Sequence, residues 1–234
     1  MTPAPMIGSA PSAGTGMLAV LCDLEPRWHR EFREWLRDDM MPARMRIGGF
    51  PAAASYDRIE GAAENQGGTE PFATVYEAAS IGDLYGAPYQ ALRANRDQRD
   101  KDFHARFIAP ARYTLSWVGP EFLRLPARQG EGSSTGFAPI AVIDRLDIPE
   151  AALQAFNMWL VIDYLPRLGA VAGLVRARRY LAMEGRPRHV LLHEFESADA
   201  LADPAWKAAR ADLVAHVPTG PTSGAYARVL SVTS

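Results

Sequence analysis

The sequence contains a single cysteine, no run of 18 apolar residues and no cluster of lysine and arginine side chains. The one cysteine, Cys22, cannot form an intramolecular disulfide, and its apolar surroundings (MLAVLCDL) favour a buried structural thiol over a nucleophile. Without a long apolar run there is no candidate for a transmembrane helix. A net charge of −2 argues against nucleic acid as the main partner. These absences predict a cytoplasmic protein with no membrane or nucleic-acid partner.

The common motifs of catalytic and cofactor sites are missing as well. The chain has no Gly-rich phosphate loop, no Ser-His-Asp arrangement, no HExxH and no CxxC. Its histidines and carboxylates do not assemble into a two-histidine, one-carboxylate metal pattern. The sequence therefore predicts no metal site and no cofactor.

The chain does contain an internal repeat. Trp35, Pro42, Gly49 and Tyr56 recur as Trp159, Pro166, Gly173 and Tyr180, at a constant offset of 124 residues. Further on, residues 73–93 (ATVYEAASIGDLYGAPYQALR) resemble residues 190–210 (VLLHEFESADALADPAWKAAR) at an offset of 117. A unit of this length is too long for a solenoid repeat and suits a small domain. We therefore predict two copies of one domain.

Two stretches of small and flexible residues frame these copies. Residues 1–16 lack the basic and apolar regions of a signal peptide and predict a disordered tail. Residues 126–136 (PARQGEGSSTG) have the composition of an exposed linker. We predict a first repeat over residues 17–119, a linker over 120–137 and a second repeat over 138–234.

Hydrophobic patterning predicts the order β-α-β-β-α-β in each repeat, which is the ferredoxin-like arrangement of an α+β fold. The expected strands cover residues 17–23, 52–58, 72–78 and 112–118 in the first repeat and 140–146, 175–180, 190–195 and 226–232 in the second. The expected helices begin at Pro26 and near residues 83, 149 and 201. Because each sheet would leave one apolar face uncovered, we expect the two faces to press together and close one barrel with the helices outside.

The first helix of each repeat carries a stripe of residues at helical spacing. Trp28, Phe32, Trp35 and Asp39 form this stripe in the first repeat, and Ala152, Phe156, Trp159 and Asp163 form it in the second. The spacing predicts that Asp39 and Asp163 lie on the apolar face, either as acid–base groups or as anchors of the helix to the sheet.

The doubled pattern Trp-x6-Pro-x6-Gly, followed by strand residues ending in ARRY and by a later L-x-E-[FL] strand, resembles the dimeric α+β barrel superfamily. The similarity covers both repeats and is closest to the EthD-like proteins, here as a tandem fusion. The resemblance implies small-molecule chemistry, because relatives include monooxygenases without metal or flavin, muconolactone-type isomerases, polyketide cyclases, lyases and haem-binding members.

In the EthD-like pattern the helix end reads roughly W-Y-D-E-E-H-x-P, and its histidine is the usual candidate acid or base. That histidine position is Met40 in the first repeat and Tyr164 in the second, while the acidic position is kept as Asp39 and Asp163. Met40 cannot move a proton. The phenol of Tyr164 can do so with help, because its ordinary pKa lies near 10.

The second repeat has the more polar set of candidate residues. It presents Tyr164, Arg178 and His193 where the first repeat presents Met40, Ala54 and Tyr76. We predict one pocket between sheet and helices, with Tyr164, His193 and Asp163 as catalytic residues. The predicted substrate-binding residues are Arg178, Tyr180, Trp159, Phe156 and Trp206. Structural alternatives remain open: His193 could be a core histidine, and Arg178 could pair with Asp163 rather than bind a carboxylate or phenolate.

These residues favour a cofactor-independent enzyme that acts on a small apolar, aromatic or polyketide-like substrate by proton transfer, as a lyase, isomerase or cyclase. One alternative is a non-catalytic module that binds a hydrophobic ligand or serves assembly, and a homodimer is compatible with either. Cofactor-free oxygenation is a further alternative. Haem binding would require an axial histidine that faces a cavity.

Overall fold

A computed structural model describes residues 6–8, 13–124 and 136–233 of the chain. The strands are β1 (Met6–Gly8), β2 (Gly16–Asp23), β3 (Ala52–Arg58), β4 (Phe72–Ala78), β5 (Ile108–Trp117), β6 (Glu121–Leu123), β7 (Ile140–Leu146), β8 (Leu174–Glu184), β9 (His189–Phe195) and β10 (Thr222–Thr233). The helices are η1 (Pro26–Trp28), α1 (His29–Trp35), η2 (Leu36–Met40), α2 (Met41–Arg46), η3 (Ile81–Leu84), α3 (Ala87–Ala94), α4 (Gln98–Arg106), α5 (Glu150–Trp159), η4 (Leu160–Tyr164), α6 (Leu165–Arg167), η5 (Leu168–Ala170), η6 (Ala198–Ala202) and α7 (Pro204–His216).

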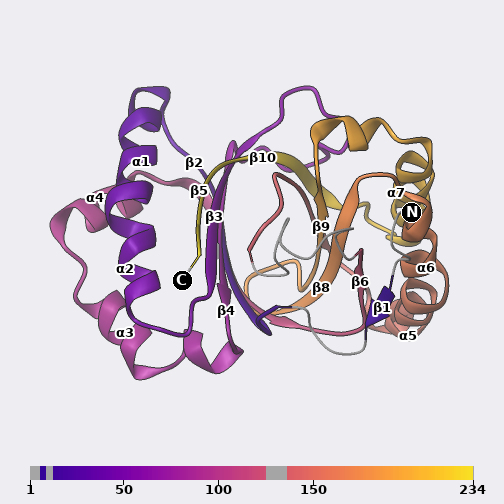
Figure 1. Ribbon diagram of the computed structural model, residues 1–234, viewed down its shortest axis with the longest axis horizontal. Coiled ribbons are helices and arrows are strands. Elements are labelled where there is room, and N and C mark those ends of the chain that lie inside the picture. The colour runs from indigo at the N-terminus through magenta and orange to yellow at the C-terminus, as the bar shows by residue number, and fades with distance from the viewer. Residues whose placement is uncertain (1–5, 9–12, 125–135, 234) are drawn as a thin grey trace.

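Strands of both repeats form one closed antiparallel barrel, in the order β8-β5-β2-β4-β3-β10-β7-β9 and back to β8. The repeats join along two seams, where β3 pairs with β10 and β5 pairs with β8. Helices α1 to α4 cover one side of the barrel and α5 to α7 cover the other (Figure 1). The predicted pair of ferredoxin-like units in an intrachain barrel is confirmed.

Strands β4, β7 and β9 are buried at every position, on both faces, which explains why their sequences are rich in apolar residues. In β2, Met17, Ala19 and Leu21 belong to the core inside the barrel. Leu18 and Cys22, on the other face of the same strand, pack under the helices of the first repeat. A side chain's place along a strand therefore decides whether it lies inside the barrel or between sheet and helices.

The first helix of each repeat contains a five-residue π turn directly after its tryptophan. These turns are η2 and η4, and they lie at the same 124-residue offset as the sequence repeat. The Met41 N–H donates to the Leu36 carbonyl and the Leu165 N–H to the Leu160 carbonyl, each five residues back. A π turn contains one residue more than an α turn, so the residue that points toward the sheet lies one position later in the sequence.

The π turn corrects the predicted stripe. Met40 and Tyr164 face the core, whereas Asp163 is exposed and Asp39 is half-buried and pairs with Arg99 at 2.5 Å. Uninterrupted helical spacing would have placed the two aspartates inward, so the expectation that Asp163 lies on the apolar face is wrong.

Three further elements differ from the expected pattern. Helix α4 lies in a segment for which no helix was expected. Its sequence (QRDKDFHAR) is mostly polar and therefore shows no apolar stripe that would predict a helix. Strand β1 lies within the predicted disordered tail, and β6, with which it pairs, lies within the predicted linker. The remainder of the linker at 125–135 and of the tail at 1–5 and 9–12 falls outside the described residues. Across the described part of the chain, no helix is long and apolar enough to span a bilayer.

Candidate functional site

Tyr164 and His193 meet on the helix side of the second repeat. The π turn η4 directs Tyr164 at the sheet, and β9 presents His193 on its outer face. The Tyr164 hydroxyl lies 2.9 Å from Nε2 of His193, and both side chains are almost completely buried. One buried hydrogen bond therefore joins two residues that are 29 positions apart in the sequence.

A carboxylate continues this chain on the other side of the imidazole. Oδ2 of Asp144, from β7, lies 3.3 Å from Nδ1 of His193. Asp144 also forms an ion pair with Arg210 at 2.5 Å and accepts from the Ser223 hydroxyl at 2.6 Å. Burial raises the pKa of Asp144, but Arg210, His193 and Ser223 outweigh it and lower the pKa to about 2. Asp144 is therefore ionised at neutral pH and fixes the imidazole.

The protonation of this chain follows from its partners. An ionised carboxylate can only accept, so the N–H of a neutral His193 lies on Nδ1, toward Asp144. Nε2 then accepts from the Tyr164 hydroxyl. Burial is the main cause that raises the pKa of Tyr164 above its ordinary value, and the charge of Asp144 adds to it. Tyr164 is consequently a protonated phenol whose hydroxyl lies against Nε2 of His193.

Aromatic rings enclose the Tyr164–His193 pair. The Trp206 ring lies 5.1 Å from the His193 ring, and its indole N–H donates to Glu64 at 2.8 Å. Trp159 lies 5.1 Å from Tyr164 and 5.6 Å from Phe156. On its outer side Trp159 stacks on the exposed His216 at 3.9 Å. The partly exposed ring of Trp159 thus lies between solvent and Tyr164, the first residue of the Tyr164–His193–Asp144 chain, which we call the relay.

The first repeat lacks this chain at the equivalent positions. Val20, Met40 and Tyr76 stand where the second repeat has Asp144, Tyr164 and His193. The guanidinium of Arg44 lies 4.7 Å from the centre of the Tyr76 ring and contacts Met40. Only the second repeat therefore contains the Tyr–His–Asp arrangement.

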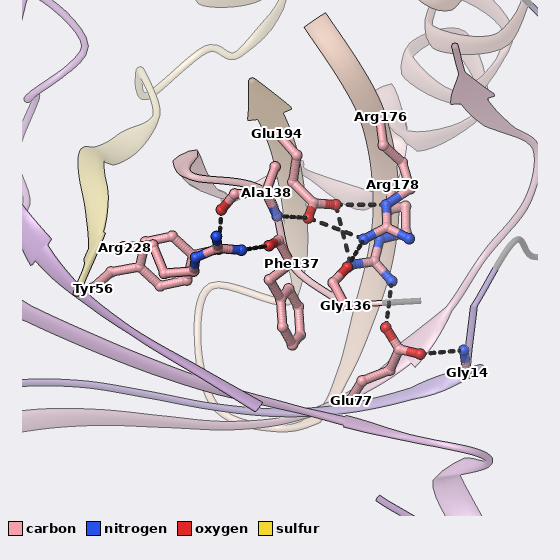
Figure 2. A network of polar contacts seen from close by, with 10 residues as sticks. All are labelled: Gly14, Tyr56, Glu77, Gly136, Phe137, Ala138, Arg176, Arg178, Glu194 and Arg228. Carbon is pink, nitrogen blue, oxygen red and sulfur yellow. Dashed lines mark hydrogen bonds and ion pairs between the residues drawn. The ribbon is translucent and has the colours of Figure 1, made fainter. Parts of the chain in front are cut away.

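Arg178 and Tyr180 lie on the opposite face of the sheet, inside the barrel. Arg178 donates to Glu194 at 3.1 Å and to Glu77 at 3.4 Å, as Figure 2 shows. Arg176 adds two bonds to Glu194, at 2.7 and 3.0 Å. Burial raises the pKa of Glu194, but the two guanidinium groups outweigh it and hold that pKa at about 2. This is a second, ionic cluster, separate from the Tyr164–His193 pair.

The ionic cluster holds residues 136–138 against β8 and β9 through hydrogen bonds (Figure 2). Arg176 donates to the Gly136 carbonyl at 2.8 Å, and Glu194 accepts from the Ala138 N–H at 3.1 Å. Arg228 donates to the Phe137 carbonyl, and the ring of Phe137 lies 5.6 Å from the Arg178 guanidinium. Glu77 accepts in the same way from the N–H of Gly14, which is 124 residues before Ala138. The geometry suits closure of the barrel better than ligand binding.

The predicted single pocket is thus divided by the sheet. The structure brings together Tyr164, His193, Phe156, Trp159 and Trp206 on the helix side. It places Arg178 and Tyr180 inside the barrel, because even and odd positions of β8 and β9 face opposite ways. Asp163 belongs to neither group, and Arg178 pairs with Glu194 and Glu77 rather than with Asp163.

Sequence reasoning missed Asp144, Arg210 and Ser223. Asp144 sits in the apolar run IAVIDRL, where a carboxylate has no apparent partner until the strands are assembled. Its alignment with Val20 was the signal that could have identified it, since a buried strand position changed from apolar to acidic.

Neither region has the features of a metal or haem site. Among the described residues, no group of three or more His, Cys, Asp and Glu side chains is placed to hold a metal ion. Both ring nitrogens of His193 face protein groups, so this histidine does not fit the role of an axial haem ligand. Inside the barrel, Met17, Val75, Tyr113 and Leu192 help to line a cavity of about 10 Å³, which is room for one water.

Comparison with known proteins supports the fold. No family model matches the chain, and no curated protein matches it. An anthrone oxidase-like protein has a similar structure, with a TM-score of 0.61 at 10% identity over 98% of this chain and 96% of that one. A candidate monooxygenase from Fusobacterium nucleatum gives 0.58 at 7% identity, over 94% and 95% of the two chains. Another from Lactobacillus acidophilus gives 0.56 at 9%, over 94% and 96%. These similarities confirm the predicted dimeric α+β barrel fold.

Proposed function

We propose that this chain, which has the dimeric α+β barrel fold, is an enzyme of proton-transfer chemistry whose acid–base group is the Tyr164–His193–Asp144 chain. The observation that supports this most directly is the asymmetry between the repeats. Three positions that are Val, Met and Tyr in one copy form a buried chain in the other, through the Tyr164–His193 hydrogen bond and the 3.3 Å contact of His193 with Asp144. Buried polar chains cost stability relative to an apolar core, so their presence in one copy favours a function there.

The arrangement can move one proton without creating an isolated charge. When the Tyr164 oxygen takes a proton from a substrate, its own proton passes to Nε2 of His193. The resulting imidazolium is stabilised by Asp144, which lies 3.3 Å from Nδ1. The reverse transfer returns the proton to the product. Because burial raises the pKa of Tyr164, this coupling replaces a free phenolate, which the site disfavours.

The surroundings of Tyr164 indicate the substrate class. Phe156 and Trp159 offer flat apolar surfaces beside the Tyr164 hydroxyl. We infer a small aromatic molecule with a weakly acidic C–H or O–H, placed against Trp159. Removal of that proton suits a lyase, isomerase or cyclase, and it also suits oxygenation, in which a carbanion reacts directly with O2.

Anthrone is a suitable probe, since one structurally similar protein is described as anthrone oxidase-like. Under argon in D2O, the relay should accelerate deuterium exchange at the anthrone methylene, measured by mass spectrometry. In air, oxygenation would convert anthrone and O2 to anthraquinone and water. We expect Tyr164→Phe and His193→Ala each to lower the exchange rate about 100-fold, the usual effect of removing an acid–base group.

Met40→Leu, in the first repeat, is the matched control and should leave the exchange rate unchanged. Exchange without anthraquinone formation would favour an isomerase or cyclase over an oxygenase. If the wild-type rate equals that of buffer, or if Met40→Leu alone abolishes the activity, the proposal is wrong.

A non-catalytic role is the second candidate, because the relay residues are closely packed in this structure. In that case the chain from Tyr164 to Asp144 would serve only to fix α7 and η4 to the sheet. The variants would then lower the free energy of unfolding, and none would change the exchange rate.

A further inference from the structure

The outer face of α5 and η4 is apolar where a solvent-facing helix is normally polar. Ala151, Ala155, Met158 and Ile162 follow one another at helical spacing, and all four are exposed. Met158 and Ile162 are 54% and 64% exposed. In Figure 1, α5 lies at the outer edge of the molecule, away from the barrel.

The first repeat provides an internal control for this face. At the positions equivalent to Ala155, Met158 and Ile162 it has Glu31, Glu34 and Asp38. Both helices fold over the same kind of sheet with the same π turn, so the fold does not require apolar residues there. The apolar residues on the outer face of the second helix therefore indicate a partner that contacts this helix from outside.

The charges at the two ends of this helix match an antiparallel copy of itself. Glu150 and Arg167 are both exposed and lie at nearly equal distances in sequence from Met158, and Arg167 also pairs with Asp212 of its own chain at 2.7 Å. An antiparallel copy centred on Met158 would place Glu150 beside the partner's Arg167 and Ala155 beside the partner's Ile162. Gln154 would then face the partner's Asp163, an amide opposite a carboxylate.

We propose that the outer face of α5 and η4 is a homodimer interface, formed by antiparallel packing of this helix on its copy about a twofold axis near Met158. A twofold interface requires one patch that is complementary to itself, and this patch has an apolar centre and opposite charges at its ends. The proposal is independent of the proton-transfer chemistry, since none of these side chains belongs to the relay.

The test compares the full-length chain with a variant that carries the first repeat's residues. Light scattering coupled to gel filtration, from about 1 to 100 µM, should show the wild type approaching twice its mass of 25.6 kDa. The triple variant Ala155→Glu, Met158→Glu, Ile162→Asp should remain monomeric throughout this range. Glu34→Gln with Asp38→Asn, on the other helix, is the matched control and should dimerise as the wild type does.

A cysteine at the proposed axis tests the geometry. Met158→Cys should form an intermolecular disulfide under mild oxidation, whereas Glu34→Cys should not, and the natural Cys22 is buried. Glu150→Arg and Arg167→Glu should each weaken the dimer, and the two together should restore it. A monomeric wild type, or a dimer that the triple variant leaves intact while its thermal unfolding is unchanged, would overturn the proposal.

Discussion

At the scale of single residues, the same side chain lies in different surroundings at equivalent positions of the two repeats. Trp35 and Trp159 are the anchors of the sequence repeat, yet their environments are unlike. Trp35 is buried and stacks on Phe103 at 4.9 Å. Trp159 remains partly exposed and stacks on His216. One is a core residue, and the other covers the relay.

We therefore expect unequal effects of truncation. Trp35→Ala should lower the free energy of unfolding by roughly 3–5 kcal/mol, as for other large buried aromatics. Trp159→Ala should lower it by only about 1–2 kcal/mol, because part of its ring already contacts water. Urea denaturation followed by circular dichroism measures both. Equal losses would show that Trp159 is packed as tightly as Trp35.

Asp144 offers a second prediction for a single residue. Asp144→Asn keeps the side-chain volume but leaves the buried Arg210 without its counter-charge, so we expect a loss of about 3–5 kcal/mol. Ser223→Ala removes two hydrogen bonds, one to Asp144 and one from Arg210, but keeps the ion pair, so we expect a smaller loss of about 1–3 kcal/mol. If both variants unfold at the same urea concentration, Asp144 is not the electrostatic centre of this network.

Among the secondary-structure elements, the turn that follows the first helix has nearly the same backbone conformation in the two repeats. Gly49 and Gly173 have φ values of +75° and +74°, a conformation that favours glycine. An added Cβ would lie 2.8 Å from the Asp83 carboxylate in one repeat and 2.8 Å from the Ala200 Cβ in the other. Both turns thus approach the segment after the third strand, in β4–η3 and β9–η6.

This geometry predicts the effect of a methyl group. Gly173→Ala should cost backbone strain of about 1–3 kcal/mol plus the contact with Ala200. Gly48→Ala is the matched control, because Gly48 has the same φ of +75° but nothing within 4 Å of an added Cβ. It should cost the strain alone. Thermal unfolding of the two variants compares them directly, and identical losses would mean that the contact with Ala200 relaxes freely.

For the whole molecule, stability depends on two buried carboxylates. Glu194 and Asp144 have pKa values lowered to about 2, because the neighbouring guanidinium groups outweigh the effect of burial. A lowered pKa contributes stability that is complete above the ordinary values of 4.5 and 3.8. That contribution decreases as the pH falls toward 2.

The free energy of unfolding should therefore fall steeply as the pH decreases from about 4.5 to 2. Urea titrations at a series of pH values measure it. Glu194→Gln should flatten this decrease, whereas Asp199→Asn, a change at an exposed carboxylate, should leave the profile as it is. A profile that Glu194→Gln does not alter would show that acid unfolding has another origin.

Much of the architecture could be predicted from the sequence because it repeats. The shared spacings of tryptophan, proline, glycine and tyrosine indicated two copies, and apolar runs located β3, β4 and β7 at their observed bounds. The closed barrel followed from the need to bury the second face of each sheet. Local pattern and burial are enough for these conclusions.

The site depended on features that no local pattern contains. A π turn changed the inward residue from Asp163 to Tyr164, and hydrogen-bond geometry rather than composition decides such a turn. Strand alternation separated Arg178 from His193, because a side chain's face depends on the exact register of β8 and β9. Asp144 acquired its partners from β9, α7 and β10 only when distant segments met. The repeat and its apolar pattern thus determined the barrel scaffold. Only the tertiary structure determined which polar groups lie on the same side of the sheet.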